Sequence, residues 1–244
     1  LTPPYSSSTQ SVTPHYAYEP VETSSASGRP QFNADAQSAE PSTPSAEASA
    51  TVVSAADAVE MFSRMRGKLR ADDNGAIVEA DLSYSDVTDE ALASIAIFQE
   101  IKELDLTGTQ VHDQSLVAIQ HLPKLQSLKL KGTQISSPGM TSLTQIHTLV
   151  LLDASNTAVA DDGLTQASSW TNLRYLSLNN TAVTDASIPH LTSITTLKGL
   201  SLLNTRVTAE GAQTLKKALP ACLIVTSKEL ESNPSAAIGP LQPV

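Results

Sequence analysis

The sequence predicts an α/β solenoid, in which a curved parallel β-sheet lines the concave face and helices line the convex face. The first observation behind this prediction is a 24-residue repeat that runs from residue 77 to residue 220 without an insertion. The second is that each repeat carries two apolar sets, an early one at strand spacing and a later one at helical spacing. One such unit cannot bury its own apolar face, whereas a stack of six units can.

Residues 1–50 form the first predicted region, a disordered arm rich in Ser, Thr, Pro and Ala. The arm contains no Lys and no hydrophobic periodicity, so it would bury too little apolar surface to offset the entropy of ordering. Any order in it is expected to come from a partner chain. The stretch from Pro14 to Pro20 contains two tyrosines and has two interpretations, a short docking motif or part of a solvated tether.

Residues 51–76 form the second predicted region, a cap made of a helix and a hairpin. Ser54 and Asp57 have the spacing of a capping box, and the apolar stripe that follows predicts a helix ending near Gly67. The Asp-Asp-Asn-Gly run at 72–75 predicts a tight turn that pairs residues 68–71 with residues 76–80. This run lacks the other ligands of a helix-loop-helix calcium site, so we interpret it as a turn.

Residues 77–220 form the third region, six repeats in register. Positions four and six of each repeat point to the same side of a strand and are expected to be buried together. The fourth position is occupied by Ala80, Leu104, Leu128, Leu152, Leu176 and Leu200. The ninth position is Ser85 and then Thr in every later repeat, and its hydroxyl is placed to pair with backbone groups where the chain leaves the strand. Residues 221–226 predict a closing strand, and residues 227–244 a C-terminal tail.

The repeat follows the pattern L-x-x-L-x-L-x-x-T-x-V-T-D-x-x-L, which one copy carries through Leu176, Leu178, Thr181, Val183, Thr184, Asp185 and Ile188. This pattern resembles bacterial leucine-rich-repeat proteins and the cysteine-containing, ribonuclease-inhibitor-like repeats of F-box proteins. The resemblance covers about 144 of the 244 residues and implies a horseshoe fold with a binding role. The chain has Thr where the F-box relatives have Cys, and residues 1–76 do not resemble an F-box, so a ubiquitin-ligase function is not implied.

Composition narrows the range of partners. The formal net charge is −10, from 25 acidic and 15 basic residues, which disfavours nucleic acid and anionic membranes. No apolar run reaches transmembrane length. The single cysteine, Cys222, cannot form an internal disulfide, and we predict that it is buried and unreactive in the closing strand.

No catalytic, cofactor or metal site is predicted. Metal ligands must converge within a small shell, but the histidines fall at different repeat positions. They are His15, His112, His121, His147 and His190.

The candidate binding residues lie at the third, fifth and seventh repeat positions, which face away from the core. Glu79, Glu103, Asp81 and Asp105 are expected to form a two-by-two carboxylate patch, because neighbouring strands lie about 4.8 Å apart. Two interpretations are open. The patch is either a solvated face that Lys129 and Lys131 partly neutralise or a dock for a basic segment of a partner.

An apolar centre is predicted further along the same face. Leu151 and Tyr175 occupy the third position of adjacent repeats, and Leu203 lies in a neighbouring column. Exposed here, these side chains would anchor a partner, since Tyr is common among energetic anchors. Chance exposure of apolar side chains is the alternative.

These observations predict a non-catalytic protein–protein interaction module or accessory subunit that binds through the solenoid surface and the N-terminal arm. The alternatives are a secreted effector or adhesin that binds a host or surface molecule, and a regulatory fragment of a longer enzyme. The expected location is the periplasm or the cell exterior, with the cytoplasm left open. The partner is a protein of unknown identity.

Overall fold

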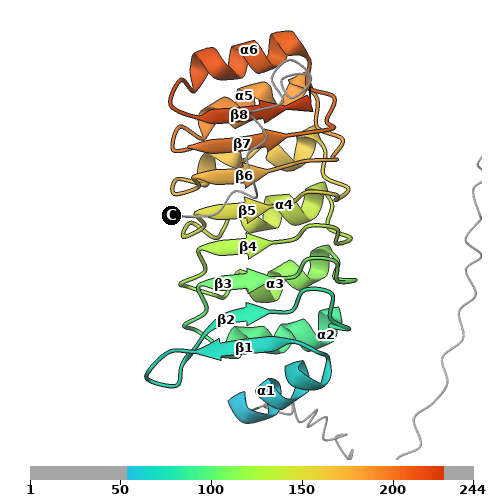
Figure 1. Ribbon diagram of the computed structural model, residues 1–244, viewed down its shortest axis with the longest axis vertical. Coiled ribbons are helices and arrows are strands. Elements are labelled where there is room, and N and C mark those ends of the chain that lie inside the picture. Colours follow the sequence, from blue (N-terminus) through green and yellow to red (C-terminus); the bar gives the residue numbers. More distant parts are fainter. Residues whose placement is uncertain (1–53, 228–244) are drawn as a thin grey trace, which may run out of the picture. The chain divides into compact units, whose positions relative to one another are not determined.

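The computed structural model describes residues 54–227, so the predicted arm at 1–50 and nearly all of the predicted tail at 227–244 lie outside the described residues. Within the described range, eight strands form one sheet in the order in which they occur in the chain (Figure 1). The first two strands pair antiparallel, and every later pair is parallel. The strands are β1 (Lys68–Ala71), β2 (Ile77–Asp81), β3 (Glu103–Asp105), β4 (Ser127–Lys129), β5 (Leu151–Asp153), β6 (Tyr175–Ser177), β7 (Gly199–Leu202) and β8 (Leu223–Thr226).

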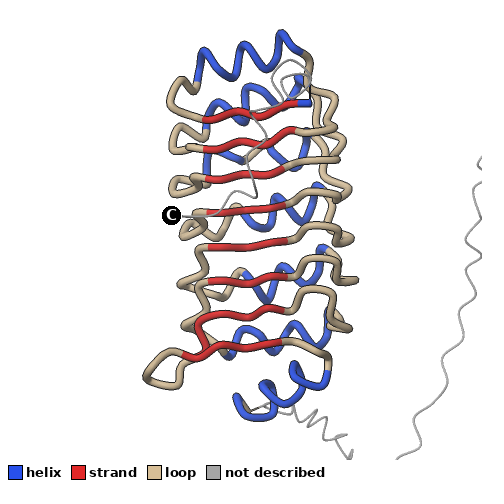
Figure 2. The backbone as a smooth tube through the Cα atoms, viewed as in Figure 1, coloured by secondary structure: helices blue, strands red, loops and turns tan. Residues whose placement is uncertain are grey.

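Within residues 54–227, helical segments cover one face of this sheet and none lies on the other face (Figures 1 and 2). The α-helices are α1 (Ala55–Arg64), α2 (Asp89–Leu92), α3 (Leu116–Ile119), α4 (Ser137–Leu143), α5 (Ile188–Ser193) and α6 (Ala209–Ala218). The 3₁₀ helices are η1 (Ala93–Ile97), η2 (Asp113–Ser115), η3 (Asp161–Leu164), η4 (Ala167–Ser169) and η5 (Asp185–Ser187). The predicted α/β solenoid is therefore confirmed.

The predicted register places the apolar columns in the core. All six residues of the fourth column are at most 1% exposed, and the strand pairing aligns them, for example Leu104 with Leu128 and Leu152 with Leu176. The helical layer differs from the prediction in the repeat that contains β5, where η3 and η4 replace an α-helix. There Ala167 stands in a column of larger residues, and the buried Trp170, which is 1% exposed, donates from Nε1 to the carbonyl oxygen of Leu143 at 3.2 Å.

The two ends of the solenoid depart slightly from the expected boundaries. Ser54 and Asp57 form the predicted capping box of α1. The helix ends at Arg64 rather than near Gly67, because Arg66 adopts a left-handed φ of 68°. At the other end β8 begins at Leu223, so Cys222 lies just before the closing strand and not within it.

The ninth-position threonines close the turn after each strand. Each hydroxyl donates to the carbonyl oxygen three residues earlier, as from Thr109 to Leu106 at 2.7 Å and from Thr181 to Leu178 at 2.6 Å. This confirms the predicted pairing with backbone groups. The turn also needs a left-handed residue at the eighth position, and φ is positive at Tyr84, Gly108, Gly132, Asn156, Asn180 and Asn204.

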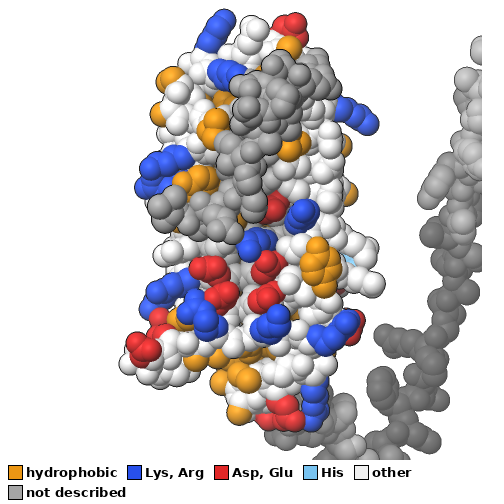
Figure 3. Space-filling view, in the orientation of Figure 1, with side chains coloured by type: hydrophobic (Ala, Val, Ile, Leu, Met, Phe, Trp, Pro, Cys, Tyr) orange, Lys and Arg blue, Asp and Glu red, His pale blue; other side chains and the backbone are white. Residues whose placement is uncertain are grey.

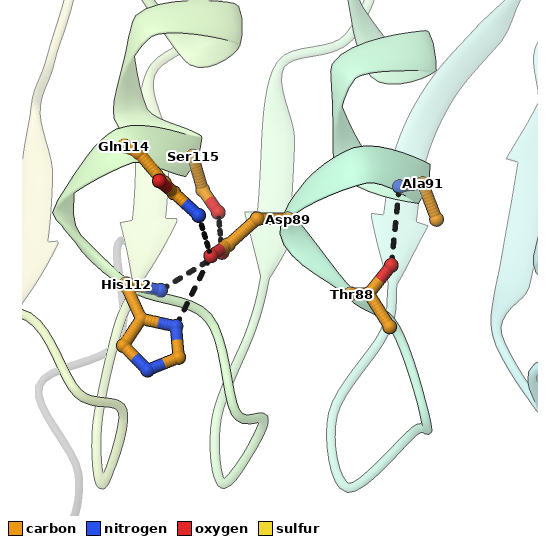
Figure 4. A network of polar contacts seen from close by, with 6 residues as sticks. All are labelled: Thr88, Asp89, Ala91, His112, Gln114 and Ser115. Atoms are coloured by element: carbon orange, nitrogen blue, oxygen red, sulfur yellow. Dashed lines mark hydrogen bonds and ion pairs between the residues drawn. The ribbon is translucent and has the colours of Figure 1, made fainter.

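A second ladder of hydrogen bonds joins each repeat to the next at the thirteenth position. The Asp161 carboxylate accepts from the backbone nitrogen of Thr184 at 2.8 Å and from its hydroxyl at 2.7 Å. Asp185 binds Thr208 in the same way, at 2.8 and 2.6 Å. The fullest example is Asp89, to which His112, Gln114 and Ser115 of the next repeat all donate (Figure 4).

Candidate partner-binding surface

The sheet face, defined as the strand side chains that point away from the helices, carries the predicted binding residues. The register aligns Glu79 with Glu103 and Asp81 with Asp105, so the structure brings the four predicted carboxylates together. The next strand adds Lys129 directly beside Asp105. Acidic and basic side chains interleave over this part of the sheet (Figure 3).

Two cations that the sequence analysis did not single out come from β1. Arg70 pairs with Glu79 in the sheet, and its Nε lies 2.5 Å from Oε2 of that carboxylate. Lys68 pairs with Asp81, with Nζ 4.0 Å from Oδ2. The hairpin predicted from the turn at 72–75 places β1 beside β2, but the register shift between Arg70 and Ala71 sets these particular partners, and the sequence analysis did not foresee it.

The two predicted lysines behave differently. Lys129 Nζ lies 3.0 Å from Oδ2 of Asp105. Burial lowers the pKa of Lys129, but its hydrogen bond to Asp105 and the nearby carboxylates outweigh this and raise the pKa overall. Lys131 is exposed and forms no ion pair with another residue in the range 54–227.

Most of the carboxylates are thus already occupied. The Ser83 hydroxyl donates to Asp81, and this bond holds the pKa of Asp81 below its ordinary value. Glu103 is exposed and has no ion-pair partner among the described residues. The surface therefore carries interleaved charges of both signs, in which Glu103 and Lys131 form no ion pair with another residue of the range 54–227.

The predicted apolar centre needs a correction. Tyr175 and Leu203 are half-buried, but Leu151 is only 5% exposed and cannot serve as an exposed anchor. It nevertheless lies outside the contiguous hydrophobic core. Its direct neighbours in the sheet, Ser127 and Tyr175, flank it at strand spacing of about 4.8 Å, which restricts the access of water to it.

Other reactive side chains on the chain do not converge. Within residues 54–227, no three His, Cys, Asp or Glu side chains are grouped so as to hold a metal ion. The Nδ1 atom of His112 lies 3.1 Å from Oδ2 of Asp89. Cys222 is half-buried, and burial raises the pKa of its thiol to about 11, so it is a poor nucleophile at neutral pH.

Comparison with known proteins agrees with this fold. A family model described as "Leucine Rich repeat" matches residues 121–143. No curated protein matches the chain. None of the helices between residues 54 and 227 has the length and hydropathy needed to cross a membrane.

Three solved structures illustrate the likeness. A leucine-rich-repeat protein of Leptospira interrogans is 21% identical over 68% of this chain and 39% of its own, with a TM-score of 0.50. Internalin C2 of Listeria monocytogenes is 21% identical over 61% of this chain and 70% of its own, with a TM-score of 0.45. The leucine-rich-repeat ectodomain of the Arabidopsis receptor kinase HAESA was solved with a peptide hormone. It is 14% identical over 65% of this chain and 27% of its own, with a TM-score of 0.48.

The chain thus spans 39% of the length of the Leptospira protein that it matches. At this identity the likeness concerns the fold. Together with the 24-residue repeat, it shows that the chain has the fold of leucine-rich-repeat proteins.

Proposed function

We propose that this chain is a non-catalytic protein-binding module, and that a segment of a partner protein lies across the sheet face. The observation that carries the proposal is the change in character along that face. Charged side chains occupy β2 to β4 and continue to Asp153 of β5, while hydroxyl, amide and apolar side chains such as Tyr175 and Leu203 follow from β6 onward.

The charges that remain available suggest how the partner is oriented. Glu103 and Lys131 have opposite signs, are exposed and form no ion pair with another described side chain. Glu103 nevertheless interacts electrostatically with Arg70 and Lys129. Contacts between charges on two partners set the orientation and the association rate more than the affinity. Tyr175 supplies the apolar contact, since a half-buried ring can lose its remaining water on binding.

The proposal includes a role as an accessory subunit of a larger assembly, located in the periplasm or outside the cell. The cysteine content is compatible with this location and with the cytoplasm alike, because a single thiol has no second cysteine in the chain with which to pair. Fractionation of the native cells tests the location.

The test compares full-length baits in quantitative affinity purification. One bait carries Glu103→Lys with Lys131→Glu, which preserves the net charge while reversing the two available charges. The matched control carries Glu210→Lys with Lys217→Glu, the same exchange on the exposed side of α6. A partner that binds the sheet face is lost from the first bait and retained by the second.

Surface plasmon resonance with the recovered partner then separates the two roles. The charge exchange on the sheet face should slow association, with a loss that shrinks as salt rises. Tyr175→Ala should weaken binding by about 2 kcal/mol, mainly through faster dissociation. If both face variants bind as the wild type does, the sheet face is not the docking surface.

A further inference from the structure

Tyr84 stands out in the turn that follows β2. The equivalent residue in every later repeat is Gly or Asn, the two residue types that best tolerate a left-handed backbone. Tyr84 adopts the same conformation, with a φ of 53°, although a bulky side chain is disfavoured there. Its side chain is 71% exposed, so burial does not compensate for the strained backbone. Neither local preference nor packing therefore explains a tyrosine at this position, and strain of this kind is typical of functional sites.

The ring of Tyr84 rests against backbone. A Cβ atom added at Gly108 would lie 2.6 Å from the ring carbons Cδ1 and Cε1, so the ring occupies space that only glycine leaves open. Gly132 of the next repeat continues the same surface, since a Cβ there would be 3.9 Å from the Gly108 backbone. The ring is thus supported by glycine on one side while most of it faces solvent.

Polar groups without partners lie around the ring. The Ser85 hydroxyl is buried, and within the described part of the chain it makes no hydrogen bond, unlike the threonines that replace it in later repeats. Gln110 and Gln134 occupy the same column of adjacent repeats, and both are exposed. Buried unpaired hydroxyls are rare in folded proteins, so the first repeat differs from the later ones at this turn as well.

These residues line one open cavity of about 1020 Å³, together with Asp86, Glu90 and the Asp89 network of Figure 4. Most of its carboxylates are already engaged. Asp86 accepts from Arg66 at 2.8 Å, Asp89 is held by the next repeat, and Asp113 binds Ser136. The groups left to meet a ligand are chiefly the Tyr84 ring, the two glutamine amides and the exposed carboxylate of Glu90.

We propose that this cavity binds a neutral carbohydrate. A sugar ring has an apolar C–H face that can stack on Tyr84, and its adjacent hydroxyls match the paired donors and acceptors of Gln110 and Gln134. An anionic ligand would be repelled by the carboxylates, and a basic peptide would find most of them already bonded. The site is separate from the sheet face and adds a second activity to the proposed function.

The experiment uses the full-length protein and four neutral probes: cellotetraose, maltotetraose, mannotetraose and the tetramer of N-acetylglucosamine. Saturation-transfer NMR identifies a bound probe, and titration calorimetry measures its affinity. We expect at least one probe to bind at millimolar concentration or below. Tyr84→Asn should weaken that binding at least tenfold and Gln134→Ala severalfold.

Two control measurements distinguish a loss of sugar binding from a loss of folding. Tyr84→Asn installs the residue that repeats four to six use at this position, so its urea midpoint should equal or exceed that of the wild type. Asn156→Gly alters the same backbone position outside the cavity and should leave sugar binding unchanged, as should Tyr175→Ala on the sheet face. Absence of binding by all four probes, or equal binding by Tyr84→Asn, overturns the proposal. Binding of tetralysine that depends on Tyr84, without sugar binding, would assign the cavity to basic peptides instead.

Discussion

Removal of a single ladder carboxylate should weaken the joint between two repeats, and Asp161→Ala is the clearest case. The Asp161 side chain belongs to one repeat, whereas both groups that donate to it belong to Thr184 of the next repeat. The Thr184 hydroxyl also accepts from the backbone nitrogen of Ala186, which caps η5. Loss of the carboxylate therefore removes the inter-repeat contact and loosens the cap behind it.

The magnitude follows from the number and kind of bonds. Hydrogen bonds to a charged group contribute about 1.5–3 kcal/mol each. Asp161 accepts two of them, and both it and Thr184 are half-buried, so water replaces part of what is lost. We expect Asp161→Ala to lower the free energy of unfolding by about 2–4 kcal/mol. Asp161→Asn keeps one acceptor oxygen and should cause about half of that loss.

The neighbouring residue provides the control. Asp162 is exposed and its carboxylate accepts only from the backbone nitrogen of Gly163, at 3.1 Å, so Asp162→Ala removes the same charge without touching the next repeat. Its expected cost is below about 1 kcal/mol, the scale of a carboxylate in the first turn of a helix. Equilibrium urea unfolding measures both, and with a slope of about 2 kcal/mol/M the Asp161 variant should shift the midpoint by about 1–2 M. Equal midpoints for the two alanine variants would refute the role of the ladder.

Three further predictions test the core, the pH dependence and the thiol. Leu128→Ala and Leu176→Ala should each cost about 2–5 kcal/mol in urea unfolding, because both leucines are 0% exposed; a loss below about 1 kcal/mol would contradict the register. Burial raises the pKa of Asp89, but the donors of the next repeat outweigh it and hold the pKa below its ordinary value. The stability that this provides is present above about pH 4 and is lost as the pH falls through the folded-state pKa, so Asp89→Asn should show a shallower loss of stability in acid. Cys222 should react slowly with a thiol reagent at pH 8 in the native protein and rapidly in urea, since its thiol pKa is raised to about 11 in the fold; equal rates would contradict its burial.

The repeat period and its apolar columns predicted the fold because every repeat must place apolar side chains at the same positions in order to stack on its neighbours. The strand register was available from the same columns, and so was the proximity of Glu79, Asp81, Glu103 and Asp105. The pairing of β1 with β2 followed from the predicted turn, whereas the register shift that sets Arg70 beside Glu79 did not. The ladder of hydrogen bonds between repeats is also visible in the sequence. Asp recurs at the thirteenth position, and where Ser137 replaces it the partner at 160 is Ala, which has no hydroxyl to donate.

Solvent exposure was beyond what the sequence could decide. A strand position specifies the face on which a side chain lies, but its exposure depends on everything that surrounds it, and Leu151 on the outward face proved to be 5% exposed. The sequence also did not show that the Ser85 hydroxyl lacks a hydrogen-bond partner among the described residues, or that the Tyr84 ring packs against Gly108. By itself the sequence determined the period, the fold and the pairing of columns, because these follow from spacing along one chain. Only the tertiary structure decided which charges are neutralised and which side chains are exposed to water. Both depend on distances between side chains of different repeats, and repeat spacing does not specify side-chain conformation.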